Sequence, residues 1–308
     1  MTTALPTVSV IMTVYDAERY VGAAVESILA QTYDDFEFII IDDGSRDRSP
    51  TILQRLSERD ERIHLVSRAN TGICPARNEA LALARGELVA ILDADDIALR
   101  ERLSTQVEFF RTHDSVVCAG GWFEVIDWAG RMLTVLKPPT GDAEIQEQLL
   151  QGHTAICQPA CMFRREASAR IGGFDESMSS SEDLDFFLRL GEIGTLANIP
   201  KCLVRYRIHG ASTSATARME MYEHARAACA RAWQRRGTSG TFEPADPWRP
   251  DDTRRSRFEW TMKCGWWAFM SGQRRTATLY GMKAVALMPH RSKGWRLLAC
   301  CAVKPRGG

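Results

Sequence analysis

The sequence predicts an α/β fold in which helices cover a parallel sheet. Short apolar runs alternate four times with longer runs whose apolar residues recur at helical spacing. The short runs are apolar at nearly every position, which is typical of strands buried on both faces of a sheet. Polar side chains suited to binding a ligand follow where these strands are expected to end.

The first part of the chain supplies the four strand–helix repeats. We expect strands at residues 8–15, 36–41, 63–66 and 88–92. Asp16 is suited to cap the helix after the first strand, whose inner face carries Val21, Val25 and Ile28. Gly86 is suited to end the helix before the fourth strand. Right-handed connections between such elements give a parallel sheet.

A smaller region follows the main domain. The 308 residues are enough for one large α/β domain and an appendage. Residues 211–217 are small and polar and mark a candidate boundary, and residues 237–252 are rich in proline, glycine and polar side chains, as in an irregular linker. Helical runs occupy much of the rest of the C-terminal region.

The composition is that of an ordinary globular protein, with 45% hydrophobic and 25% charged residues. The nine cysteines lack the paired C-x-x-C spacing of a zinc site, so we expect free thiols in a reducing compartment. No run reaches the roughly 18 apolar residues of a membrane-spanning helix, and no signal peptide is apparent. These features predict a cytoplasmic protein.

Charge is balanced over the whole chain but not along it. Lys+Arg and Asp+Glu are both 39, yet residues 261–308 contain no Asp or Glu. Trp266, Trp267 and Trp295 are interleaved there with basic residues. Two interpretations stay open: a helical cap packed on the main domain, or a peripheral surface that rests on anionic lipid at the inner face of the membrane. No recognition motif for nucleic acid accompanies these residues, so no nucleic-acid partner is expected.

The fourth expected strand ends in three carboxylates, Asp93, Asp95 and Asp96. Like charges at this spacing repel one another, and a divalent cation would convert the repulsion into coordination. Carboxylate oxygens suit Mg²⁺ or Mn²⁺. The alternative is a solvated cluster that caps the helix expected to start near Leu99.

Two other strand ends carry polar side chains. The first strand ends at Thr13 and Tyr15, and the second ends at Asp42 and Asp43. Because the carboxyl ends of parallel strands share one edge of a sheet, these groups are expected to face the same crevice as Asp95. The Asp-Gly pair at Asp43 also fits a simple turn. No G-x-G-x-x-G motif and no P-loop is present, which argues against a dinucleotide or P-loop site.

Glu182 and Asp183 stand just before a run with helical spacing. Ser180 and Asp183 have the spacing of a capping box, which stabilises a helix by about 1 kcal/mol, so the residues alone leave capping and catalysis open. His209 follows another expected strand. A lone histidine near a loop is often simply solvated.

Six motifs occur in the order in which family 2 glycosyltransferases carry them. They are residues 8–15, Asp42-Asp43-Gly44-Ser45, Asn70-Thr71-Gly72 with Ala76-Arg77-Asn78, Asp93-Ala94-Asp95-Asp96, Gly172-Gly173-Phe174-Asp175, and Glu182-Asp183. Over roughly residues 7–214 the chain resembles the bacterial members of that family that assemble surface polysaccharides and glycolipids.

The resemblance implies a GT-A fold over residues 1–215. Its Rossmann-like α/β half, about 1–115, would bind the nucleotide, and the half at about 116–215 would bind the acceptor on the same continuous mixed sheet. Residues 216–308 would form a helical C-terminal extension, with the linker at about 237–252.

Roles for the donor site follow from the same resemblance. Thr13, Tyr15 and Asp43 resemble the family's contacts to the base and ribose of a nucleotide-diphosphate sugar. Arg77 resembles the basic residue of the donor pocket, near the diphosphate or the base.

The resemblance also implies the metal and catalytic residues. Asp93 and Asp95 resemble the D-x-D pair, with Asp93 in the donor site and Asp95 as the direct ligand of Mg²⁺ or Mn²⁺. Asp183 resembles the general base, with Glu182 beside it. His209 stands where related enzymes bring a metal or phosphate contact.

These assignments predict an inverting, metal-assisted glycosyltransferase that moves a hexose or deoxyhexose to a hydroxyl of a glycan or lipid-linked acceptor. The alternative from another class is a non-catalytic module that binds nucleotide sugars in the same crevice. A sugar nucleotidyltransferase would need an early glycine-rich triphosphate loop, which this sequence lacks.

Overall fold

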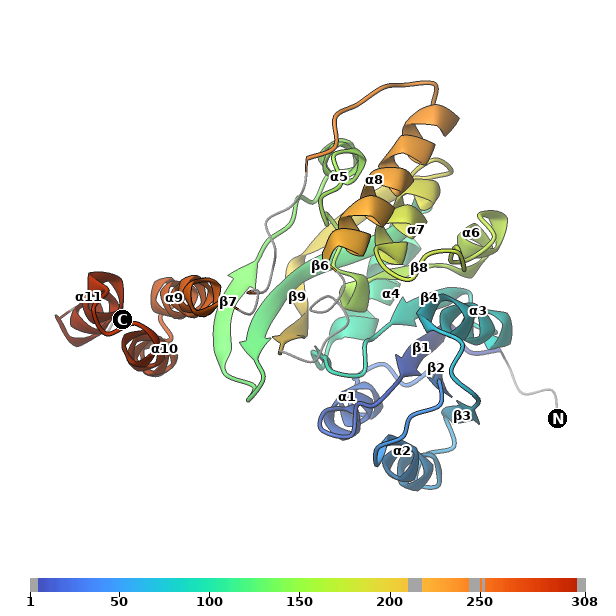
Figure 1. Cartoon of the computed structure of the whole chain (residues 1–308). Coiled ribbons are helices and arrows are strands. Elements are labelled where there is room, and N and C mark those ends of the chain that lie inside the picture. Colours follow the sequence, from blue (N-terminus) through green and yellow to red (C-terminus); the bar gives the residue numbers. More distant parts are fainter. Residues whose placement is uncertain (1–4, 210–217, 244–249, 251–252, 304–308) are drawn as a thin grey trace. The chain divides into compact units, whose positions relative to one another are not determined.

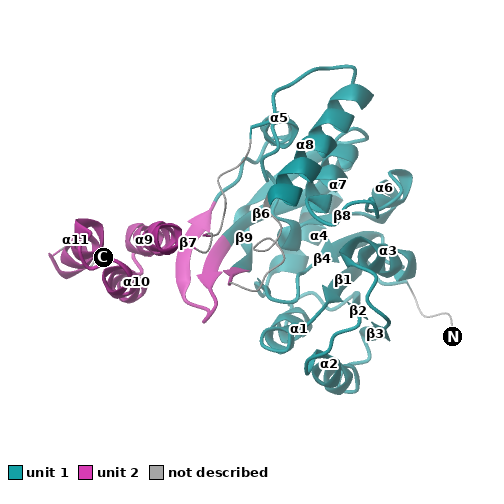
Figure 2. Ribbon diagram, viewed as in Figure 1, with its two compact units in different colours: residues 1–123, 137–206, 217–245 teal, residues 124–136, 207–216, 246–308 magenta. Residues whose placement is uncertain are grey.

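The computed structural model describes residues 5–209, 218–243, 250 and 253–303 (Figure 1). Two compact units are present, and each is described by itself (Figure 2). The first unit comprises residues 1–123, 137–206 and 217–245, and the second comprises residues 124–136, 207–216 and 246–308.

The parallel part of the sheet confirms the predicted α/β repeats. Its strands are β1 (Val8–Val14), β2 (Phe36–Asp42), β3 (Ile63–Ser67) and β4 (Leu88–Ile91). β1 lies between β2 and β4, and β2 continues to β3, all in parallel. β2 and β4 are buried at every position, as expected for strands covered on both faces.

The helices between these strands are α1 (Val21–Leu29), α2 (Ser49–Ser57) and α3 (Ile73–Leu83). The prediction that Asp16 caps α1 was wrong, because α1 begins after Tyr20 without a side-chain cap. Asp16 lies in a turn with φ of 49° and accepts hydrogen bonds from the backbone of Arg46 and Asp47. Its carboxylate therefore joins two loops at the strand ends.

Gly86 does not end α3 either, since that helix ends at Leu83. A Cβ atom at Gly86 would lie 2.6 Å from the backbone nitrogen of Ser9. Glycine is required because two backbones approach each other closely at the amino ends of β1 and β4.

Antiparallel strands extend the sheet beyond β4. The described residues give the strand order β3-β2-β1-β4-β8-β6-β9-β5, with β7 paired to β6. The elements after β4 are β5 (Ile97–Ala98), α4 (Arg102–Thr112), β6 (Val116–Asp127), β7 (Met132–Leu136), α5 (Asp142–Leu150), the 3₁₀ turn η1 (Gln158–Ala160), β8 (Met162–Arg164), α6 (Arg165–Arg170), α7 (Glu182–Leu190), β9 (Thr195–Ile208) and α8 (Arg218–Arg235).

The carboxylate cluster at 93–96 does not cap α4, so that alternative was wrong. α4 begins at Arg102 after Glu101, without a side-chain cap. Residues 97 and 98, just before the expected helix start at Leu99, form β5 and pair with Arg205 and Val204 of β9.

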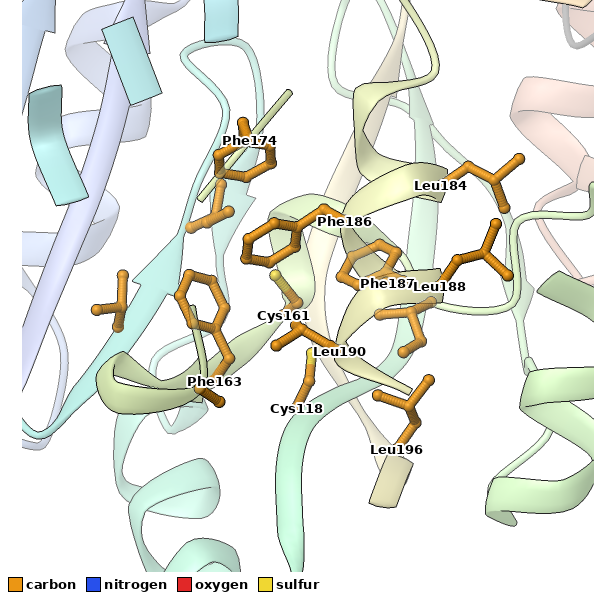
Figure 3. Packing of buried hydrophobic residues seen from close by; sticks show 14 of the residues in the cluster. Cys118, Cys161, Phe163, Phe174, Leu184, Phe186, Phe187, Leu188, Leu190 and Leu196 are labelled. Atoms are coloured by element: carbon orange, nitrogen blue, oxygen red, sulfur yellow. The ribbon is translucent and has the colours of Figure 1, made fainter. Parts of the chain in front are cut away.

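Aromatic packing fixes the segment that leads into α7. The Phe186 ring stacks on Phe174 at 4.2 Å between centroids and meets Phe163 edge-on at 5.1 Å (Figure 3). Phe187 is buried in the same cluster. α7 is thus anchored to β8 and to the loop at Phe174, which determines where its first residues lie.

The second unit contains three helices among its described residues. They are α9 (Arg254–Met270), α10 (Arg274–Leu287) and α11 (Ser292–Val303). Phe258, Met262 and Leu297 are at the centre of their shared core. The hydroxyl of Tyr280 donates to the buried carboxylate of Asp127 at 3.1 Å, which ties α10 to the end of β6.

The division between the units differs from the boundary expected near residue 215. α8 belongs to the first unit, where Ala228 and Ala232 are buried in the core with α7. Conversely, the second unit takes in residues 124–136, which lie far earlier in the chain. Residues 238–243 of the expected linker form neither helix nor strand. In the described ranges, no helix is long and apolar enough to cross a membrane.

A buried carboxylate joins the amino ends of the parallel strands. Glu37 is 3% exposed, accepts from the Ser9 hydroxyl at 2.6 Å and pairs with the guanidinium of Arg85 at 2.7 Å. Burial opposes its ionisation, but the hydrogen bonds from Ser9 and Arg85 outweigh burial and hold the pKa of Glu37 below 4.5.

We expect Glu37→Ala to lower the free energy of unfolding at pH 7 by about 3 kcal/mol, because it leaves buried donors without an acceptor. Since the pKa of Glu37 is lower in the folded state, this contribution is present above about pH 4.5 and is lost as the pH falls below it. Urea titrations at pH 7 and pH 3.5 measure both effects. Glu26→Gln, which breaks an exposed ion pair with Arg59, is the control and should change stability by less than about 0.5 kcal/mol. Equal losses in the two variants would contradict the assignment.

Candidate active site

The acidic turn follows directly on β4. The backbone nitrogen of Leu92 still donates to Ile11 of β1, and that of Asp96 then donates to the carbonyl of Asp93 at 3.2 Å, which closes the turn. Asp96 is fully buried. The side chain of Asp93 is 30% exposed. The turn therefore presents part of its charge outward from the carboxyl end of β4.

Arg77 joins this turn to the start of α7. It comes from the middle of α3 and is 2% exposed. Its guanidinium pairs with Glu182, donates to Gln158 Oε1 at 2.8 Å and lies 3.3 Å from Asp93 Oδ1. Two predicted site residues from distant parts of the sequence thus share one cation.

The start of α7 does not form the predicted capping box. Ser181 precedes the helix with φ of 55° and makes no side-chain cap bond. Ser180 instead contacts His224 Nδ1 of α8 at 3.0 Å, and the Ser181 hydroxyl donates to the carbonyl of Met221. Because the side chains of Ser180 and Ser181 bond to α8, the capping interpretation of Ser180 was wrong.

Three carboxylates lie in the field of Arg77, those of Asp93, Glu182 and Asp183, and the charge of Asp95 acts on Asp93. Burial, and then the charge of Glu182, raise the pKa of Asp183 to about 6. Burial also raises the pKa of Asp93, against the charge of Arg77 and with that of Asp95. The cluster holds more negative charge than its arginine compensates.

Asp43 holds a loop at the neighbouring strand end. Its Oδ1 accepts from Arg68 Nε at 2.8 Å and from the backbone nitrogen of Thr71, and its Oδ2 accepts from the backbone of Gly72 at 2.9 Å. The carboxylate is 4% exposed. It therefore does more than the simple Asp-Gly turn would require, because it fixes residues 68–72 ahead of α3.

The remaining predicted residues lie at strand ends. Thr13 is half-buried within β1, and Tyr15, which follows that strand, is 48% exposed. β1 lies directly between β2 and β4, so the ends that carry Thr13, Asp43 and Asp93 share the carboxyl edge of the sheet. His209 follows β9 and belongs to the second unit; the structure does not place it relative to Asp95.

Two residues of this region were not predicted from the sequence. Gln158, in η1, accepts from Arg77, and Arg102, at the start of α4, is buried beneath the acidic turn. Neither stands in a recognisable motif, because their partners are a residue 81 positions away and backbone carbonyls. Only the fold reveals them.

The donor set suits a divalent cation. Over the described part of the chain, no group of three or more His, Cys, Asp and Glu side chains is arranged to hold a metal ion. Asp93 and Asp95 nevertheless carry hard carboxylate oxygens, which would suit such an ion, and their charges repel each other. A magnesium or manganese site that uses two carboxylates and completes its shell with substrate phosphates and water needs no more from the protein.

The sequence profile described as Glycosyl transferase family 2 matches residues 9–172, more than half of the chain. The O-antigen biosynthesis glycosyltransferase WbnJ of Escherichia coli is 31% identical over 217 residues, which are 69% of this chain and 84% of that relative.

Solved structures share the fold at low sequence identity. The mannosyltransferase PcManGT of Pyrobaculum calidifontis, in complex with GDP-Man and Mn²⁺, gives a TM-score of 0.59 at 19% identity and covers 98% of this chain and 87% of its own. S. aureus TarS in complex with UDP-GlcNAc gives a TM-score of 0.57 at 17% identity, with coverage of 95% and 89%. The profile match, the relative and the shared architecture together show that this chain belongs to glycosyl transferase family 2 and has a GT-A fold.

Proposed function

We propose that this protein transfers a sugar from a nucleotide-diphosphate donor to a hydroxyl of a glycan or lipid-linked acceptor, with inversion at the anomeric carbon. The observation that carries the proposal is the Arg77 guanidinium, which pairs with Asp93 after β4 and with Glu182 at the start of α7. It brings the acidic turn and Asp183 into one electrostatic cluster.

The reaction needs a base on the acceptor side. The acceptor oxygen attacks the anomeric carbon, the bond from that carbon to the diphosphate breaks, and the diphosphate leaves with the electron pair. The hydroxyl proton passes to the carboxylate of Asp183. Its pKa of about 6 leaves it ionised at neutral pH yet a stronger base than an ordinary aspartate. Direct attack assisted in this way inverts the anomeric configuration.

Glu182 and Arg77 act beside the base. One oxygen of Glu182 pairs with Arg77, whose guanidinium is buried and already bound to Asp93 and Gln158. We therefore assign Glu182 and Arg77 to positioning Asp183 and Asp93. These bonds use three of the five N–H donors of the guanidinium, and Arg77 stays the predicted basic residue of the donor pocket.

Asp95, with Asp93, is proposed to hold Mg²⁺ or Mn²⁺. Such an ion, when bound, would act as a Lewis acid and neutralise charge on the departing diphosphate. His209 stays a predicted metal or phosphate contact. PcManGT was solved with GDP-Man and Mn²⁺ and TarS with UDP-GlcNAc, which supports a donor of the same chemical class here. Thr13, Tyr15 and Asp43 would contact its base and ribose.

The biological setting proposed is surface polysaccharide biosynthesis at the cytoplasmic side of the membrane. A relative that acts in O-antigen biosynthesis supports this setting. The sugar would be a hexose or deoxyhexose.

Peripheral contact with anionic lipid is proposed for α11. Trp295 is 55% exposed, and Lys293 and Arg296 on either side of it are exposed as well. Val303, at the end of the helix, is 82% exposed. An exposed tryptophan flanked by basic side chains is suited to the interface between headgroups and acyl chains.

Asp183→Asn is expected to lower turnover by about 10²–10⁴-fold, because it removes the proton acceptor. A thermal-shift screen of nucleoside diphosphates with Mn²⁺ selects the donor class, and release of the diphosphate from the matching sugar donor measures turnover. Binding of that diphosphate should stay within about 3-fold of wild type, since Asp183 acts on the acceptor side. Asp175→Asn, in the loop before α7, is the control and should keep turnover.

Turnover by Asp183→Asn equal to wild type would remove Asp183 from the mechanism. If the wild-type protein binds a diphosphate in a metal-dependent way but transfers no sugar to any acceptor or to water, the non-catalytic binding module is the correct alternative.

Asp183→Asn is also expected to stabilise the protein at pH 7.5, by about 1–2 kcal/mol. The pKa of Asp183 is raised from 3.8 to about 6 on folding, so the folded state binds its proton more tightly and loses stability as the pH rises from about 4 to 6. The gain should shrink between pH 7.5 and pH 4.5 in thermal unfolding. Asp175→Asn should instead lower the free energy of unfolding at pH 7.5, because hydrogen bonds from Ser177 lower the pKa of Asp175. A destabilised Asp183→Asn would contradict the charge argument.

The lipid contact is tested by flotation with vesicles that contain 30% phosphatidylglycerol. Reversing two charges, Lys293→Glu with Arg296→Glu, should weaken partitioning more than 10-fold, since each basic side chain contributes about 1 kcal/mol near an anionic surface. Arg55→Glu with Arg59→Glu, on α2 and in the turn after it, is the control and should float like wild type. Binding that is the same on neutral vesicles would rule out the electrostatic contribution.

A further inference from the structure

Arg102 is a fully buried cation that the proposed mechanism does not use. It is the first residue of α4, its side chain is 0% exposed, and it is among the largest fully buried side chains of the chain. Burial lowers the pKa of Arg102 to about 10, so the guanidinium remains charged at neutral pH. Removing such a charge from water is unfavourable unless hydrogen bonds to the guanidinium compensate for it.

The guanidinium lies where the parallel and antiparallel parts of the sheet meet. Its Nη2 donates to the carbonyl of Ile91 at 2.7 Å and to that of Cys161 at 3.0 Å. The β4–β8 pairing ends one residue earlier, at Ala90 opposite Met162. Beyond that point the backbone nitrogen of Ile91 donates to the carbonyl of Cys161 at 3.2 Å, and Arg102 adds bonds to the carbonyl oxygens of both residues.

Ile91 is the last residue of β4 and stands two positions before Asp93. Whatever fixes the carbonyl of Ile91 therefore fixes the direction in which the chain enters the acidic turn. Arg102 also lies in the field of Asp96 and Asp93. It supplies positive charge from beneath the turn, on the interior side, while Arg77 binds Asp93.

Gln106, one helical turn along α4, holds the guanidinium in place. Its Oε1 accepts from Arg102 Nε at 3.1 Å, and its Nε2 donates to the carbonyls of Ala119 and Ala160 at 3.2 and 3.0 Å. The two side chains therefore link α4 to β4, β6 and the η1–β8 segment. A lysine could carry the charge, but its three donors share one nitrogen, whereas Arg102 donates to Gln106 from Nε and to both carbonyls from Nη2.

We propose that Arg102, held by Gln106, is a positioning residue that sets the placement of the Asp93–Asp95 turn for a complex of metal ion and nucleoside diphosphate. This inference rests on the proposed donor site. It adds a part of the site that acts through the backbone of β4 and does not touch the ligand.

Arg164 offers a matched control at the other end of the same strand pair. It stands on β8 opposite Leu88, and its guanidinium also donates to carbonyls, those of Val116 and Phe110. Arg164→Met and Arg102→Met thus remove the same kind of interaction. Arg164→Met removes it at the far end of the strands, and Arg102→Met removes it beneath the acidic turn.

Two measurements separate positioning from general stability. Hydrogen exchange in a peptide that spans residues 91–99 reports the order of the turn without any ligand. Binding of Mn²⁺ in the presence of UDP or GDP, followed by electron paramagnetic resonance, reports the metal–nucleotide complex. Arg102→Met should speed exchange in the turn at least 10-fold and weaken Mn²⁺ binding at least 10-fold, with partial recovery in Arg102→Lys. Arg164→Met should change neither by more than about 3-fold.

The inference is overturned if folded Arg102→Met binds Mn²⁺ and exchanges like wild type, or if Arg164→Met shows the same changes. Should Arg102→Met fail to fold, Gln106→Met takes its place, because it removes the side chain that holds the guanidinium. Gln106→Met should speed exchange in the turn and weaken Mn²⁺ binding, each by 3- to 10-fold. Failure of the donor-site proposal gives a different result, because wild-type protein and Asp95→Asn would then bind Mn²⁺ equally weakly. In that case the hydrogen-exchange measurement still decides whether Arg102 orders the turn.

Discussion

The candidate site depends on one buried cation, Arg77, that is shared between two carboxylates from different parts of the fold. Without it, the turn after β4 and the start of α7 would bring like charges together with nothing between them. The guanidinium can bind Glu182, Asp93 and Gln158 at once because its planar array of donors spans three directions. Packing of α7 through Phe186 and Phe187 supports the same geometry from the apolar side.

Ionised buried carboxylates have opposite effects on stability at the two ends of the parallel strands. At the amino ends, Glu37 is surrounded by donors that favour its ionised form, so its charge stabilises the fold. At the carboxyl ends, Asp93 is buried near other carboxylates, as is Asp183 of α7, so ionisation of either group costs stability. Excess negative charge of this kind is expected where a protein must bind a cation or accept a proton.

The sequence predicted the parts of this architecture that repeat locally. Apolar runs identified β1, β2 and β4, and the polar residues after them identified the edge where Asp43 and Asp93 lie. Helix starts were less predictable, because Asp16 and Ser180 found partners in distant loops and in α8 in place of their own helices. Gln158 and Arg102 could not be found at all, since the groups they bind come together only after folding.

The way α8 covers α7 has a consequence for protein engineering. Arg231 of α8 pairs with Asp185 at 3.0 Å, and Arg236 donates to the carbonyl of Leu188. Farther along, the backbone of Glu243 still donates to Gln151. A recombinant fragment cut near residue 215 would strip α7 of its α8 partners and expose its apolar flank, so a shortened protein that keeps these bonds should extend to residue 243.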